Sequence, residues 1–208
     1  MRKKTKDKEL LFVKTAKDLF IKQGIGSTSM EAIATEAGAS KATLYSYFPS
    51  KESLFEAVVN EAAIGARESF AFANKTENLV EALHRLGMAY LELMTRPDII
   101  AVNRLIISES GRQPELTRIF YENGPRNIHL SICETLQIFI NKKIIDIADV
   151  QQAGIYFKAM CDAELVERQL WGLDDAPTSN KCKNSVENAV KFFLAAFSLS
   201  HIIKVNNN

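Results

Sequence analysis

Residues 28–48 read TSMEAIATEAGASKATLYSYF, and this stretch decides the fold of the N-terminal part of the chain. Its pattern predicts two short helices joined by a tight turn. The small side chain of Ala34 lets the helices cross closely, Gly38 takes the left-handed conformation at the turn, and Leu44 anchors the second helix in a core. This spacing is typical of a helix-turn-helix motif, which we place at about residues 29–48.

Capping residues support the two short helices. Thr28 is predicted to cap the first helix, and Glu31 three residues later would complete a capping box. Ser40 is predicted to cap the second helix, whose apolar face holds Leu44 and Phe48 at a spacing of four residues. Both helices are too short to be stable alone, so they must pack against neighbouring elements.

The outward face of the second short helix carries side chains that suit a nucleic acid. A lysine such as Lys41 pairs with phosphate, Thr43 can bond to a phosphate or a base edge, and Ala42 is small enough to meet a thymine methyl group. Tyrosine hydroxyls suit phosphate oxygens, and Lys51 adds charge near a helix N-terminus. The alternative is a short helical hairpin inside a larger bundle. The predicted DNA contacts are Thr28, Ser40, Lys41, Ala42, Thr43, Tyr45, Tyr47 and Lys51.

The charge of the chain is unevenly distributed. The 208 residues include 26 Lys and Arg against 25 Asp and Glu, a formal net charge of +1. Residues 1–51 hold ten of the basic and five of the acidic residues, so the N-terminal part carries +5 and the remainder −4. A basic N-terminal module favours an anionic partner such as a nucleic acid, although a lysine-rich end can also serve only solubility.

Composition excludes several classes of protein. Hydrophobic residues make up 47% and charged residues 25%, as in an ordinary globular protein. We expect neither a membrane span nor a secretory signal, because the chain lacks both a long uncharged apolar window and a cleavable leader pattern. Three widely separated cysteines, Cys133, Cys161 and Cys182, argue against a disulfide framework and a zinc site. These features indicate a reduced, cytoplasmic protein without a metal or other cofactor.

Helical periodicity dominates the whole chain, and no strand or hairpin pattern is found, so the predicted class is all-α. Pro125 falls inside one of the predicted stretches, where it can kink or break the helix. The predicted helices cover a first segment ending at Gln23, then 29–37, 41–47, 51–73, 78–94, 98–111, 115–141, 149–170 and 184–204.

The N-terminal quarter, from Leu10 to about Val59, resembles the tetracycline-repressor (TetR) family of bacterial transcriptional regulators. The resemblance implies a three-helix DNA-binding head at residues 1–52 and a larger helical body at 53–208 for effector binding and dimerisation. It also implies a homodimer, a palindromic operator and repression relieved by a small ligand. The residues that carry it are Ala16, Leu19, Phe20, Gly24, Thr28, Ile33, Ala34, Ala37-Gly38-Ala39-Ser40, Thr43-Leu44-Tyr45 and the string Tyr47-Phe48-Pro49-Ser50-Lys51-Glu52-Ser53-Leu54.

The body resembles the C-terminal domain of an AefR-like subgroup, through residues 104–109 and the segment from Pro114 to Pro125. In the family the last two helices pair with their mates in a four-helix bundle; here these are about 149–170 and 184–204. The final helix is apolar on more than one side, as expected for contact with both its own core and a partner. The predicted dimer contacts are Val190, Phe193, Leu194, Phe197 and His201.

An effector pocket is expected between the helices of the body, lined by apolar residues with a few polar ones. Each candidate residue can equally be an ordinary core residue. The predicted ligand contacts are Met88, Tyr90, His129, Cys133, Tyr156, Met160 and Trp171, with Met94 and His84 as further candidates.

Taken together, the residues and the resemblance predict a DNA-binding, ligand-responsive transcriptional repressor at the bacterial nucleoid. The alternative is an architectural DNA-binding protein that needs no ligand. An enzyme is not expected, because the sequence has no metal-binding histidine motif, nucleophile elbow, phosphate loop or dinucleotide fingerprint.

Overall fold

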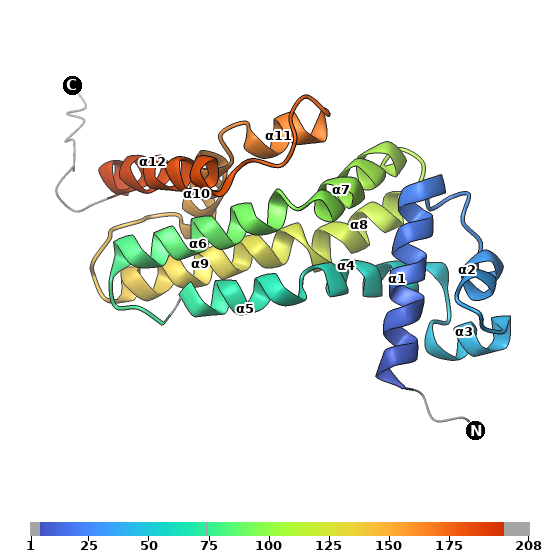
Figure 1. The fold of residues 1–208 in the computed structure, drawn as a ribbon. Helices are drawn as coiled ribbons and strands as arrows, with labels where there is room; N and C mark the ends of the chain where they lie inside the picture. The colour runs from blue at the N-terminus through green and yellow to red at the C-terminus, as the bar shows by residue number, and fades with distance from the viewer. Residues whose placement is uncertain (1–4, 74, 198–208) are drawn as a thin grey trace. The chain divides into compact units, whose positions relative to one another are not determined.

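The computed structural model describes residues 5–73 and 75–197 of the chain (Figure 1), and these residues form helices and no strand. This confirms the all-α prediction. The helices are α1 (Lys6–Gln23), α2 (Met30–Glu36), α3 (Lys41–Tyr47), α4 (Lys51–Ala62), α5 (Ile64–Ala73), α6 (Leu79–Met94), α7 (Pro97–Glu109), α8 (Pro114–Asn123), α9 (Pro125–Asn141), α10 (Val150–Asp162), α11 (Leu165–Leu170) and α12 (Ser179–Phe197).

By their internal packing, the helices divide into two compact units. Unit 1 combines the N-terminal residues up to Ile64 with Asp98–Arg126, and unit 2 combines Gly65–Pro97 with the residues from Asn127 onward. Unit 1 therefore contains α1–α4, the whole of α8 and all of α7 except its first residue. These units are defined by packing, whereas our boundary at residue 52 separates a DNA-binding part from an effector-binding part. That boundary stays a prediction.

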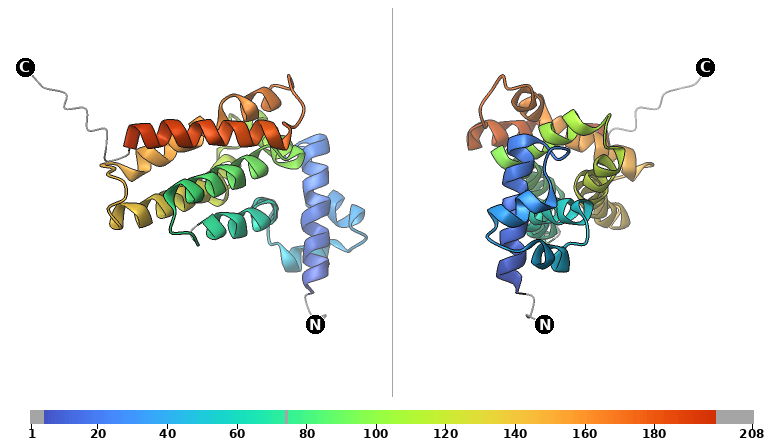
Figure 2. Two further views of the ribbon diagram at one scale, coloured as in Figure 1. Left: turned by 60° about the vertical axis from the view of Figure 1, so that its left-hand side comes forward. Right: turned by 90° about the vertical axis from the view of Figure 1, so that its right-hand side faces the viewer.

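The core of unit 1 is built around α1, whose Phe12 and Phe20 are almost completely buried. Leu44 of α3 and Phe55 of α4 are also inaccessible to solvent, and Ile106 of α7 belongs to the same cluster. Figure 2 shows the short α2 and α3 beside the long α1 in both views. Burial of these side chains stabilises two helices of only seven residues each, which would not persist alone.

The turn between α2 and α3 has the predicted form. Gly38 has φ +60°, and the amide of Ala39 donates to the carbonyl oxygen of Ala34 at 2.9 Å. The Ser40 hydroxyl accepts a hydrogen bond from the amide of Thr43 at 3.1 Å, which confirms Ser40 as the cap of α3. The helix-turn-helix geometry therefore follows from one glycine and one capping serine.

Replacing Gly38 by valine is expected to lower the free energy of unfolding by about 2 kcal/mol, because a β-branched residue resists positive φ. The space around a Cβ atom at this position is open, so backbone strain rather than a clash determines the cost. Gly38→Asn is the control and should cost less, since asparagine tolerates this conformation. Urea unfolding of both variants checks this; equal stability of the valine and asparagine proteins would contradict the strain argument.

The start of α2 differs from the prediction. Ser29, not Thr28, caps this helix, and its hydroxyl accepts from the amide of Ala32 at 3.1 Å. Thr28 is buried, and its hydroxyl donates to the carbonyl oxygen of Gly24 at 2.7 Å. The Thr28 side chain is thus used to close the loop after α1, where Gly24 ends the helix with φ +86°.

Three long predicted helices are each divided in two in the structure. The 51–73 stretch is interrupted at Ala63, and the 149–170 stretch at Ala163 and Glu164, both of which have positive φ. The predicted helix at 115–141 is two helices, α8 and α9, which are separated at Gly124 and Pro125, in agreement with the expected effect of a proline. The last helix starts at Ser179, earlier than predicted, and residues 198–204 lie outside the described part of the chain.

Unit 2 is held together by α6, α10 and α12, which pack on one another; Figure 2 shows α12 running alongside α6. Phe157 of α10 and Phe193 of α12 are buried and meet edge to face at 5.3 Å between ring centroids. Gly87 of α6 lies so close to α12 that a Cβ atom there would stand 2.7 Å from Val186. The close crossing of α6 and α12 therefore depends on the absence of a side chain at residue 87.

No helix among the described residues combines the length and apolar character needed to cross a membrane. The same residues contain no group of three or more His, Cys, Asp or Glu side chains arranged to hold a metal ion.

Candidate functional site

The outward face of α3 is the first candidate site. Leu44 and Phe48 are buried beneath it, so the opposite side of the helix is fixed toward solvent. Lys41, Ala42 and Tyr45 are exposed there, whereas Thr43 and Tyr47 are half-buried. Ser46 is exposed on the same face and was missed in the sequence analysis, although it stands one helical turn after Ala42.

Hydroxyl groups run along this face from the N-terminal cap to the last turn of α3. The oxygens of Ser40 and Thr43 lie 2.8 Å apart and share a hydrogen bond, and Ser46 donates to the carbonyl oxygen of Thr43 at 2.7 Å. Ser40 Oγ is also the capping atom of α3. Ser40 and Thr43 therefore hold each other in place while both remain close to the surface.

Lys41 is held by a carboxylate in the unbound protein. Its ammonium group forms an exposed ion pair with Glu31 of α2 and lies 5.7 Å from the centre of the Tyr45 ring. The hydrogen bond from Lys41 lowers the pKa of Glu31, and Glu31 in turn raises the pKa of Lys41, so both groups stay charged near neutral pH. A phosphate that binds Lys41 must therefore compete with Glu31.

Tyr47 connects α3 to the beginning of α1. Its hydroxyl oxygen accepts a hydrogen bond from the Thr5 amide at 2.9 Å, and its ring meets Phe12 edge to face at 5.4 Å. This contact joins residues that are 42 positions apart in the sequence. The predicted DNA contact Tyr47 thus also fixes the position of its own helix.

Lys51 and Thr28 have internal partners. The Lys51 ammonium donates to the carbonyl oxygens of Ile25 at 2.8 Å and Thr28 at 3.1 Å, which ties the start of α4 to the loop between α1 and α2. Thr28 is 1% exposed. Both residues stabilise the loop that leads into the helix-turn-helix motif. A direct contact of either residue with DNA stays a prediction.

Replacing Lys51 by methionine is expected to lower the free energy of unfolding by about 1–2 kcal/mol, because two carbonyl groups lose a charged donor while the apolar stem is kept. Lys14→Met, at an exposed lysine of α1, is the matched control and should stay within about 0.5 kcal/mol. Urea unfolding measures both. If the two substitutions prove equally mild, the Lys51 hydrogen bonds do not stabilise the loop.

Comparison with known families gives two matches that together cover most of the chain. Residues 12–58 match the model described as bacterial regulatory proteins of the tetR family, and residues 81–198 match the C-terminal domain of AefR-like transcriptional repressors. The chain belongs to the TetR family. It is therefore a transcriptional regulator, and DNA binding is implied by the family. Members of the family are generally not enzymes.

Similarities to individual proteins agree with this assignment. A crystal structure of a chain from Mesorhizobium loti assigned to the family is 26% identical, with a TM-score of 0.81 over 94% of this chain and 100% of that one. The flavonoid-responsive regulator FrrA is 32% identical, with a TM-score of 0.80 over 95% and 100%. The regulator YuxN of Bacillus subtilis is 47% identical over 55 residues, a match that spans 26% of this chain and 19% of that protein.

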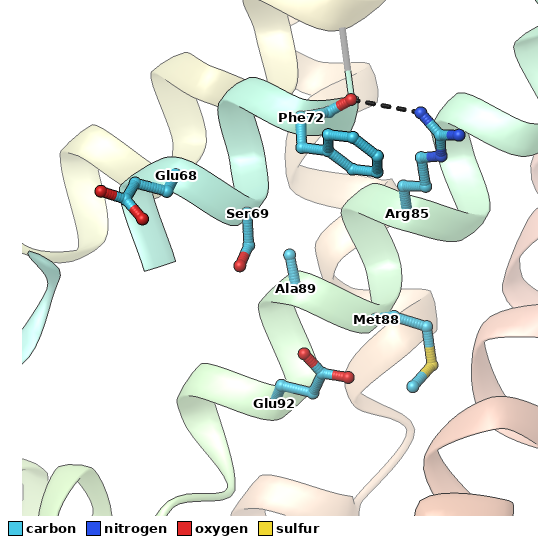
Figure 3. A pocket seen from close by; sticks show the side chains of 7 residues that line it. All are labelled: Glu68, Ser69, Phe72, Arg85, Met88, Ala89 and Glu92. Carbon is cyan, nitrogen blue, oxygen red and sulfur yellow. Dashed lines mark hydrogen bonds between the residues drawn. The ribbon is translucent and has the colours of Figure 1, made fainter. Parts of the chain in front are cut away.

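A second candidate site of the TetR protein lies within unit 2, where a cleft of about 420 Å³ separates α5 from α6. Figure 3 shows Ser69 and Ala89 facing each other across it, with the Phe72 ring beside Arg85 at one end. We call this space the α5–α6 cleft. Its lining residues are Glu68, Ser69, Phe72, Arg85, Met88, Ala89 and Glu92.

Of the seven predicted ligand contacts, Met88 lines this cleft. Tyr90 is buried and its hydroxyl donates to Asp162 at 3.5 Å, while His129 lies 2.9 Å from Gln151 and near the buried Cys133. The remaining predicted contacts are elsewhere in unit 2: Tyr156 and Trp171 are exposed and Met160 is half-buried. The six further cleft residues were missed because they combine charges with single apolar side chains, a pattern typical of any helix surface.

The three cysteines are all buried within unit 2. Burial raises the pKa of Cys161 to about 12, and it also raises the pKa values of Cys133 and Cys182. Because the thiolate is the reactive form, these thiols are poorly suited to fast redox chemistry at neutral pH.

The predicted dimer residues lie on several sides of α12. Val190 and Phe193 are buried in the core of unit 2, and Leu194 and Phe197 are half-buried. His201 lies outside the described residues. The outward side of the same helix instead presents Phe192, which is 67% exposed, followed by two exposed alanines.

Proposed function

We propose that this TetR-family regulator represses transcription by binding a palindromic operator as a homodimer, and that a small molecule bound in unit 2 releases it. It would act at the nucleoid in the bacterial cytoplasm. The observation that carries the proposal is the outward face of α3, which has a buried apolar anchor beneath exposed polar and cationic side chains. The match to the C-terminal domain of AefR-like repressors supports repression rather than activation of transcription.

Each group on α3 has a defined chemical role in this proposal. Lys41 leaves Glu31 for a backbone phosphate, and Tyr45 donates its hydroxyl to a neighbouring phosphate oxygen. Thr43 and Ala42 meet base edges in the major groove. The hydroxyl pair of Ser40 and Thr43 already exists in the unbound protein, which lowers the entropy lost on binding.

The proposed dimer uses the outward sides of α10 and α12. Phe192, Ile155 and Tyr156 are 67%, 45% and 49% exposed, and Ala195 and Ala196 beside Phe192 are exposed as well. Exposed apolar side chains gathered on two packed helices are typical of a protein interface. A second copy of the same surface gives a two-fold dimer, as a palindromic operator requires.

Ligand response is supported by two independent features. FrrA, which covers nearly the whole chain at 32% identity, is flavonoid-responsive by name. The α5–α6 cleft has a volume within the range of about 300–1,000 Å³ that ligand sites occupy.

Selection of bound duplexes from a random DNA pool, at low and moderate salt, tests the proposed function. We expect an enriched inverted repeat whose affinity falls steeply with salt. Footprinting the enriched duplex should protect two half-sites related by two-fold symmetry. Salt-sensitive binding without any enriched sequence would contradict a specific operator and favour the architectural alternative.

A further inference from the structure

A group of basic residues near the start of the sequence has no role in the function proposed so far. Residues 2–9 hold five Lys and Arg side chains against two Asp and Glu, so they carry +3 of the net +5 of residues 1–51. A segment of this kind either binds an anionic partner or serves only solubility. Where the fold places the segment distinguishes the two.

The beginning of α1 lies beside the end of α3. The Thr5 amide donates to the hydroxyl oxygen of Tyr47 at 2.9 Å, and Tyr47 is the last residue of α3. The Phe12 ring of α1 meets the Tyr47 ring edge to face at 5.4 Å. Figure 1 shows the same arrangement, with α3 beside the N-terminal half of α1. The basic segment therefore joins the protein at one end of the helix that we expect to bind DNA.

Lys8 places a cation at this end of α3. Its ammonium nitrogen lies 5.3 Å from the centre of the Phe12 ring, which is the ring that contacts Tyr47. Lys41, the proposed phosphate contact, is the first residue of α3 and stands at the opposite end. The seven residues of α3 span about 10 Å. Cationic groups are thus found at both ends of the proposed recognition helix.

Three further basic residues, Arg2, Lys3 and Lys4, come directly before Thr5 in the sequence and lie outside the described residues. Three residues span at most about 10 Å of chain, which limits their distance from Thr5. The major groove of B-DNA is about 12 Å wide and is bordered by a phosphate backbone on each side. A protein with α3 in this groove therefore has these side chains within reach of phosphates.

We propose that Arg2, Lys3, Lys4 and Lys8 form a second DNA contact, which binds backbone phosphates next to the bases that α3 meets. The proposal rests on the proposed function, because it requires α3 in the major groove. Contacts of lysine and arginine with phosphate fix the position of a protein on DNA but carry no sequence information. This contact therefore adds affinity, whereas α3 supplies the sequence preference.

The triple variant Arg2→Gln/Lys3→Gln/Lys4→Gln tests the proposal in the full chain. Affinity is measured by fluorescence anisotropy over a range of salt concentrations, with the selected operator and with an unrelated duplex of equal length. Operator affinity at low salt should fall about tenfold or more, and the slope of log affinity against log salt should fall by about 2–3 per chain. Because phosphate contacts are lost, affinity for the unrelated duplex should fall by a similar factor.

The matched control is Lys75→Gln/Lys181→Gln/Lys183→Gln, which removes three exposed lysines from unit 2 and has the same net charge as the triple variant. It should keep the affinity and the slope of the parent protein. Lys8→Gln changes a described residue of the proposed contact and should lower the slope by about 1 per chain.

Footprinting separates a direct contact from general attraction to DNA. The parent protein should protect backbone positions beside each half-site from hydroxyl radicals, and the triple variant should leave these positions open. Protection of guanine N7 in the major groove from dimethyl sulfate should be the same in both proteins at saturation, because α3 is unchanged.

A triple variant that keeps the affinity and slope of the parent protein would overturn the proposal and leave solubility as the role of the segment. Equal losses in the triple variant and its control would also overturn it, since net charge rather than position would then determine affinity. A loss confined to the operator would indicate base contacts instead of phosphate contacts. If the parent protein binds no duplex at all, the proposed function itself fails.

Discussion

Replacing Phe192 by aspartate is expected to turn the regulator into a monomer and to lower its affinity for the operator by about 100-fold or more. Phe192 is a large apolar side chain on α12 that is 67% exposed, so its loss removes little from the core of unit 2. A carboxylate at the centre of the proposed α10–α12 interface faces its own symmetry mate and an apolar surface, and both effects oppose association. Without the dimer, the two half-sites are no longer bound together, and the gain from bivalency disappears.

Sedimentation velocity measures the dimer, and fluorescence anisotropy with the selected duplex measures DNA affinity. Ile107→Asp is the control, because Ile107 is similarly exposed, at 61%, but lies on α7 in unit 1. It should leave the dimer intact. A Phe192→Asp protein that remains dimeric would show that the subunits pair through another surface.

Replacing the neighbouring Phe193 by alanine is expected to act on stability instead, lowering the free energy of unfolding by about 3–5 kcal/mol. Phe193 has no exposed surface and packs between Phe157 at 5.3 Å and Phe197 at 4.7 Å. The truncation leaves a cavity at the crossing of α10 and α12. A loss of this size is a large fraction of the total stability of an ordinary domain.

Thermal or urea unfolding of Phe193→Ala checks this value. Phe193→Leu keeps most of the volume and should cost less than about 1.5 kcal/mol while leaving the dimer in place. Should Phe193→Ala unfold within about 1 kcal/mol of the parent protein, the aromatic contact would not be a principal part of the core. The adjacent positions 192 and 193 thus separate association from folding.

The head of the regulator was predictable because its signals are local. Gly38 must reach positive φ, Ser40 must cap α3 and Leu44 must be buried, and each requirement can be identified within a few residues of the sequence. The structure confirms all three. The family matches agree with the resemblance that rests on the same segment.

The helix breaks were less predictable for a corresponding reason. Pro125 signals its break by removing a backbone donor, whereas Ala63, Ala163 and Glu164 are residues that ordinarily continue a helix. The sequence around these residues therefore carries no local signal for a break.

The hydrogen-bond partners of individual site residues within the protein could not be predicted from the sequence either. Lys51 and Tyr47 both have residue types that suit phosphate, yet Lys51 donates to Ile25 and Thr28, and Tyr47 accepts from Thr5. These contacts span 23 to 42 positions. A motif predicts the helix face on which a side chain lies. Only the fold shows whether the donor or acceptor groups of that side chain are already bonded within the protein.

The central claim is that the outward face of α3 binds DNA, and Lys41 tests it most directly. The measurement is the salt dependence of operator affinity for the parent protein, for Lys41→Ala and for Lys183→Ala, which removes an exposed lysine from α12. Lys41→Ala should lower affinity and reduce the slope of log affinity against log salt by about 1 per chain, or about 2 per dimer. Lys183→Ala should change neither quantity. If Lys41→Ala retains both the affinity and the slope of the parent protein, α3 does not contact the DNA backbone as proposed.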